Sequence, residues 1–179
     1  MRWIPLVIVG YLALVVQTSL VGLIALRTRL GVVGPDVPAI CAVFLALRAP
    51  RAAAAMLAGW VLGLGMDLTT GAGPGGVTVA GPLAISYALA AGLVFGVREG
   101  LFADRALSRV LLTAAFVAVA HGLWVTLQAL RAGVWTDTGR MLAQAGAVAI
   151  YSAALAPLVC AGLDRLQRWL VVVPSRRAR

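Results

Sequence analysis

The chain has 179 residues, of which 62% are hydrophobic and 12% carry a charge, and its mean hydropathy is +0.99. This composition excludes an ordinary soluble domain and predicts an integral membrane protein. All 15 basic residues are arginine, against 6 acidic residues, and we attribute the net charge of +9 to membrane topology rather than to nucleic-acid binding.

Six apolar segments predict an all-α integral membrane protein with about six transmembrane helices. The alternative spanning fold is a closed barrel, whose strands would alternate apolar and polar residues, and this sequence shows no such alternation. The second and third segments are shorter than the roughly 20 residues that cross a bilayer upright, so they begin in the loops, thin the membrane or form a re-entrant pair. The expected helices cover residues 3–26, 35–47, 52–66, 77–97, 108–130 and 141–163.

The arginines are divided unevenly between alternate loops, which predicts the orientation. With a cytoplasmic N-terminus, eleven arginines fall on the inner side, and the outer side keeps only Arg27, Arg29, Arg131 and Arg140. The positive-inside rule therefore favours a multi-pass protein with both termini in the cytoplasm. The first segment is longer than the apolar region of a signal peptide and is followed by no A-x-A site, so we expect an uncleaved helix.

Asp36 follows Gly34 and Pro35 at the expected outer start of the second helix. An unpaired carboxylate in hydrocarbon costs about 2.5–3.5 kcal/mol, so this acid needs a partner or a function. One interpretation is a cap on the helix N-terminus; the other is an ion pair with Arg27 or Arg29 of the preceding loop. The sequence leaves both open.

The third helix carries Ala55, Gly59, Gly63 and Asp67 at four-residue spacing. Small residues at this spacing let membrane helices approach closely, so we expect this face to meet another helix of the same chain, with Asp67 at the end of the contact. An acid in a loop without a role is the alternative. The glycine-rich stretch at 68–81 lacks a Gly-Lys-Ser/Thr sequence and predicts turns rather than phosphate binding.

The other polar residues form no recognisable catalytic or metal-binding set, which predicts a protein that is not an enzyme and has no cofactor. His121 is the only histidine, and Cys41 and Cys160 lie within apolar segments. A lone histidine in a membrane helix most often forms an interhelical hydrogen bond, while proton transfer or ligand contact is the alternative.

We expect a single membrane domain at residues 1–163 and a basic interfacial tail at residues 164–179. The tail combines Trp169 with five arginines. This combination favours contact with anionic lipid headgroups, with docking onto a cytoplasmic protein as the alternative.

The run PDVPAICAVFLAL, followed by G-W-x-x-G-x-x-x-D and a loop with glycine and proline, resembles the bacterial rod shape-determining protein MreD family over residues 30–95. The overall length and the six-helix hydropathy also agree. The positions that carry the resemblance are Pro35, Asp36, Phe44, Ala46, Leu47, Gly59, Trp60, Gly63, Asp67, Pro74 and Gly75.

The resemblance implies a non-enzymatic inner-membrane subunit of the cell-elongation machinery. In this role the chain would bind the single-pass scaffold MreC and, through it, the glycosyltransferase RodA, a penicillin-binding transpeptidase and the actin-like protein MreB. The residues implied as a partner-binding or structural motif are Pro35, Asp36, Phe44, Gly59, Gly63 and Asp67.

Two other functions remain open at this point. The family is similar in fold to the substrate-binding subunits of energy-coupling-factor vitamin transporters, which implies the alternative of small-molecule binding in an outward-facing pocket that includes Asp36 and Asp67. The other alternative is a structural membrane protein without a partner, in which both acids serve only folding.

Overall fold

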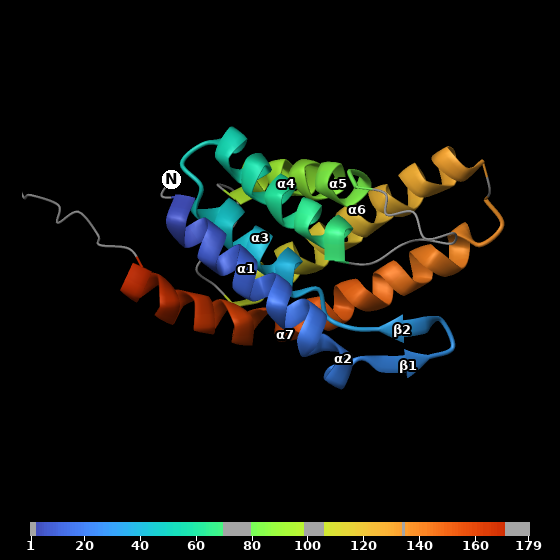
Figure 1. Cartoon of the computed structure of the whole chain (residues 1–179), viewed down its shortest axis with the longest axis horizontal. Helices are drawn as coiled ribbons and strands as arrows, with labels where there is room; N and C mark the ends of the chain where they lie inside the picture. Colours follow the sequence, from blue (N-terminus) through green and yellow to red (C-terminus); the bar gives the residue numbers. More distant parts are fainter. Residues whose placement is uncertain (1–2, 70–79, 99–105, 134, 171–179) are drawn as a thin grey trace, which may run out of the picture.

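A computed structural model gives the fold, and it describes residues 3–69, 80–98, 106–133 and 135–170. Each of the six apolar segments contains a helix, and a short hairpin lies between the helices of the first and second segments (Figure 1). The elements in chain order are α1 (Trp3–Ser19), α2 (Val21–Ile24), β1 (Leu26–Thr28), β2 (Gly31–Val33), α3 (Val37–Arg48), α4 (Ala52–Thr69), α5 (Pro82–Val97), α6 (Ala106–Ala132) and α7 (Thr138–Leu170).

The prediction of an all-α membrane protein is confirmed at the level of its helices. Within the described residues, three helices are long and apolar enough to cross a bilayer, namely Ala52–Thr69, Ala106–Arg131 and Thr138–Leu166. The shorter apolar helices are Val7–Ser19, Val37–Arg48 and Pro82–Val97. The last helix also continues without a break from the expected membrane domain into the expected tail, as far as Leu170.

The first apolar segment differs from its expected range, because the helix ends at Ser19 and the chain then forms α2 and a β-hairpin. The hairpin pairs Leu26 with Val33 and Thr28 with Gly31. The hydroxyl of Thr28 donates to the Gly31 carbonyl at 2.9 Å and accepts from the Leu30 amide at 3.2 Å, which stabilises the turn. Gly31 has a φ of 123°, a conformation that is accessible to glycine and strained for other residues.

Helices α4 and α5 lie side by side because α4 presents glycine to the α5 backbone (Figure 1). A Cβ atom built on Gly59 would lie 2.6 Å from the Tyr87 carbonyl oxygen, and one on Gly63 would lie 2.5 Å from that of Leu83. Only glycine permits this approach. The partner of the small-residue face of α4 is therefore a helix of the same chain.

One end of the helix bundle is rich in arginine, and we call it the arginine end. There Asp164 of α7 accepts hydrogen bonds from Arg48 of α3 at 2.5 Å and from Arg109 of α6 at 2.7 Å. Arg98, which follows α5, donates to the Ala49 carbonyl at 2.5 Å. The opposite end, which we call the hairpin end, contains the tip of the hairpin and the connection between α6 and α7 (Figure 1).

Candidate functional site

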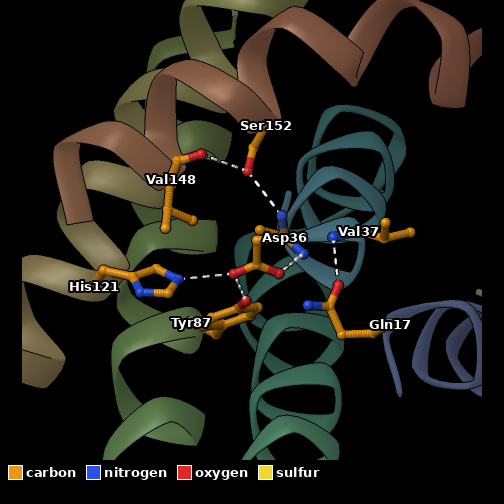
Figure 2. A network of polar contacts seen from close by, with 8 residues as sticks. Gln17, Asp36, Val37, Tyr87, His121, Val148 and Ser152 are labelled. Carbon is orange, nitrogen blue, oxygen red and sulfur yellow. Dashed lines mark hydrogen bonds and ion pairs between the residues drawn. The ribbon is translucent and has the colours of Figure 1, made fainter. Parts of the chain in front are cut away.

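Asp36 caps the N-terminus of α3 from a buried position, with only 2% of its surface exposed (Figure 2). Its Oδ1 accepts a hydrogen bond from the Ala39 amide at 2.9 Å. Pro35 is buried just before the cap, and Pro38 occupies the second helical position, where no amide donor is needed. The capping interpretation of Asp36 is confirmed.

The other carboxylate oxygen of Asp36 joins α3 to two further helices (Figure 2). It accepts a hydrogen bond from the hydroxyl of Tyr87 on α5 and lies 2.8 Å from Nε2 of His121 on α6. Tyr87 is fully buried and packs edge-on against Phe116 of α6, with ring centroids 5.2 Å apart. The ion pair expected with Arg27 or Arg29 is therefore replaced by contacts with Tyr87 and His121, because both arginines lie exposed on the hairpin.

The remaining donors at the start of α3 are satisfied by α1 and α7. The Asp36 amide donates to Ser152 Oγ at 2.9 Å, and the Val37 amide donates to Gln17 Oε1 at 3.0 Å. The hydroxyl of Ser152 in turn donates to the Val148 carbonyl at 2.8 Å. Helix α3 thus begins among side chains of four other helices that replace the water a helix end would normally contact. We call Gln17, Asp36, Tyr87, His121 and Ser152 the Asp36 network.

The Asp36 network lies deep in the bundle, whereas the sequence suggested a position at the outer membrane edge. Three of its residues lie twelve positions from the charged residues that meet at the arginine end: Asp36 from Arg48, His121 from Arg109 and Ser152 from Asp164. Twelve helical residues span about 18 Å. On α7, Ser152 lies equally far from Arg140 toward the hairpin end. In a bilayer core of about 30 Å, the network lies close to the middle.

The depth of Asp36 follows from the length of α3, which has only 12 residues. Helix α2 and the hairpin occupy the other half of the bundle beside α7. The Tyr151 hydroxyl donates to the Ile24 carbonyl of α2, and the Gln144 side-chain amide donates to the Val32 carbonyl of β2. The expected position of Asp36 at the outer membrane edge is therefore wrong, because α3 starts at mid-depth.

Asp67 caps a helix to which it does not belong. Its Oδ2 accepts from the Gly81 amide at 2.8 Å and from the Ala84 amide at 3.1 Å, and its Oδ1 accepts from the Leu83 amide at 3.3 Å. The residue preceding α5 is Gly81, which has no side chain with which to cap the helix. The carboxylate, 4% exposed at the end of α4, supplies the missing acceptor.

Replacing Asp67 by alanine is expected to lower the free energy of unfolding by about 1–2 kcal/mol, because three amides at the start of α5 lose their acceptor. Asp67→Asn keeps one carbonyl acceptor and should lose less. The measurement is a denaturation series of the purified protein in mixed detergent micelles. Equal stability of Asp67→Ala and the wild type would show that the cap does not stabilise the fold.

The other motif residues also lie in the interior. Phe44 is buried against Ala156 and Cys160 of α7, and the guanidinium of Arg48 lies 3.7 Å from the centroid of its ring. Gly59 and Gly63 contact α5, as described above. The six residues singled out in the sequence thus fix α3, α4 and α5 against their neighbours. Pro74, Gly75 and the residues from 171 onward lie outside the described residues, and so does the Trp169 side chain.

The Asp36 network contains groups that act as acids and bases in enzymes, but their geometry is that of a structural connection. The Ser152 hydroxyl is directed at a carbonyl rather than at His121, so no base activates it as a nucleophile. His121 instead forms the interhelical contact expected of a lone membrane histidine. Within the residues that the structure describes, no three His, Cys, Asp or Glu side chains gather in a way that could hold a metal ion.

Sequence analysis identified Asp36 and His121 separately and did not single out Gln17, Tyr87 or Ser152. The signal that relates Asp36, His121 and Ser152 is their common distance of twelve residues from Arg48, Arg109 and Asp164, respectively. That distance becomes informative only when those three residues are known to meet.

Comparisons of the chain with models of protein families, with curated proteins and with solved structures found no match.

Proposed function

We propose that this chain is a non-enzymatic membrane subunit of the bacterial cell-elongation machinery, binding an MreC-like single-pass scaffold and helping to organise peptidoglycan synthesis and cell shape. The observation that supports this is the role of the MreD-like motif residues. Asp36, Asp67 and the two glycines of α4 connect helices to one another. A motif of this kind defines a rigid frame rather than a reactive site.

In this proposal the outer faces of the frame, and not its motif residues, contact the partner. Helix α1 has a row of large apolar side chains that are exposed in the isolated chain, including Tyr11, Leu12 and Val15. Exposed apolar side chains of this kind suit lipid tails and the membrane helix of a scaffold equally well. The RodA-type glycosyltransferase, the penicillin-binding transpeptidase and MreB would then associate through the scaffold.

The proposed location is the bacterial inner membrane, with both chain termini and the arginine end in the cytoplasm. The distribution of arginine supports this orientation, because Arg48, Arg98 and Arg109 lie at one end of the bundle. We also propose that the basic tail contacts anionic lipids.

A transporter subunit that binds a small molecule is the second candidate. One observation favours it: the His121 side chain, which is 20% exposed, brings an ionisable group to mid-depth. Against it, binding pockets need several polar groups that converge on the ligand, whereas the groups of the Asp36 network converge on one another.

A pull-down from crosslinked bacterial membranes in mild detergent distinguishes the two candidates, with an unrelated tagged multi-pass protein as the control. We expect mass spectrometry to identify an MreC-like single-pass scaffold and the elongation enzymes with this chain and not with the control. Recovery of paired ATPases with a transmembrane coupling subunit would contradict the proposal and favour small-molecule uptake.

A further inference from the structure

The hairpin has one edge that contacts α7 and one edge that is open. On the α7 side, the Val32 carbonyl of β2 accepts a hydrogen bond from Gln144 Nε2 at 2.9 Å. Strand β1 forms the other edge, and all three of its residues are exposed. Figure 1 shows β1 as the outer strand of the hairpin, with β2 between it and α7.

The hydrogen-bonding pattern identifies which backbone groups of β1 are available. In an antiparallel pair, opposed residues alternate between those that bond to each other and those whose backbone groups point away from the partner strand. The Val32 carbonyl points away, toward Gln144, and Val32 is opposite Arg27. The amide and carbonyl of Arg27 must therefore point outward from the open edge. Neither group has a hydrogen-bond partner among the described residues.

The depth of this edge makes its exposure costly. Arg27 is opposite Val32, which contacts Gln144, and Gln144 lies eight residues from Ser152 and four from Arg140 on α7. Eight helical residues span about 12 Å, so Arg27 lies near the boundary of a hydrocarbon core whose half-thickness is about 15 Å. Open sheet edges do not occur against lipid tails, and exposed edges readily accept a further strand.

The charges around the edge indicate the chemistry of the strand that would cover it. Arg27, Arg29 and Arg140 are all exposed near the tip of the hairpin, and Arg140 reaches the Arg29 carbonyl at 3.4 Å. A second copy of the chain would place arginine against arginine across the new edge, which is unfavourable. An acidic segment would be complementary.

We propose that β1 is a docking strand for an extended, acidic segment of the scaffold, at the point where that segment leaves the membrane. The inference rests on the proposed function, because the scaffold is the partner that would bring such a segment to the hairpin end of the bundle. The added strand would bond to the amide and carbonyl of Arg27, and its carboxylates would meet the arginines.

Two proline variants of equal composition test the proposal in the chain co-expressed with the scaffold. Arg27→Pro removes the outward amide of the open edge and a positive charge. Arg29→Pro also removes one positive charge and adds a proline ring, but at the turn, where φ is negative and proline is tolerated. We expect Arg27→Pro to retain about fivefold less scaffold after a stringent wash than Arg29→Pro does.

Hydrogen exchange of the wild-type chain gives a second readout that needs no variant. The Arg27 amide should exchange at least about tenfold more slowly in the complex than in the isolated chain. If the wild type captures the scaffold but the two variants behave alike, or the Arg27 amide exchanges equally fast in both states, the docking strand is excluded and the proposed function stands. If the wild type does not capture the scaffold, the proposed function fails and the docking strand fails with it.

Discussion

Replacing Asp36 by alanine is expected to lower the free energy of unfolding by about 3–5 kcal/mol, because the carboxylate is the shared acceptor of a buried network. Its loss leaves the Ala39 amide, the Tyr87 hydroxyl and the His121 ring without their common partner. At mid-depth in a bilayer no water replaces them. Denaturation of the purified variant in mixed detergent micelles measures the change.

Asp36→Asn and Ser152→Ala are the matched controls for this prediction. The amide of asparagine keeps the size of the side chain and one carbonyl acceptor for the Ala39 amide, so it should lose less than alanine does. Ser152→Ala removes a single acceptor, that of the Asp36 amide, and should cost about 1–3 kcal/mol. A ranking in which Ser152→Ala is the most damaging of the three would show that the carboxylate is not the centre of the network.

Placing alanine at Gly59 and Gly63 together is expected to separate α4 from α5 and to destabilise the fold by about 1–3 kcal/mol per site. The new methyl groups would lie 2.6 Å and 2.5 Å from backbone carbonyl oxygens of α5, and a backbone cannot move aside as a flexible side chain can. The same denaturation series in mixed micelles measures this loss.

The chain contains its own controls in Gly122 of α6 and Gly146 of α7, where an added Cβ would meet no atom within 4 Å. Alanine there should be neutral or stabilising by up to about 1 kcal/mol, because glycine is the poorer helix former. The two pairs of substitutions are identical in composition and differ only in packing. Equal effects of the two pairs would contradict the close approach of α4 and α5.

The helices were predictable because a long apolar run in a membrane can form few structures other than a helix. The small-residue face of α4 was predictable for a similar reason, since its four-residue spacing is a local property of the sequence. The hairpin was not predictable in the same way: residues 27–34 were expected to form a loop, and the pairing of Leu26 with Val33 and of Thr28 with Gly31 is not a local property of the sequence.

The Asp36 network was only half predictable. The capping role of Asp36 follows from neighbouring residues in the chain, and the sequence contained it as one of two interpretations. Its pairing with Tyr87 and His121 depends on the depth at which α3 begins. That depth depends on the hairpin, which packs beside α7 in the half of the bundle that α3 does not reach. This packing is a tertiary property.

We expect the motif acids to hold the fold together and the partners to bind elsewhere. The most direct test is scaffold capture by the Asp36→Asn variant, compared with the wild type at equal amounts of folded protein. We expect the variant to be less stable while its folded fraction captures the MreC-like scaffold as well as the wild type does. A variant that keeps its stability and loses the scaffold would contradict a purely structural role, because Asp36 would then act in binding rather than in folding.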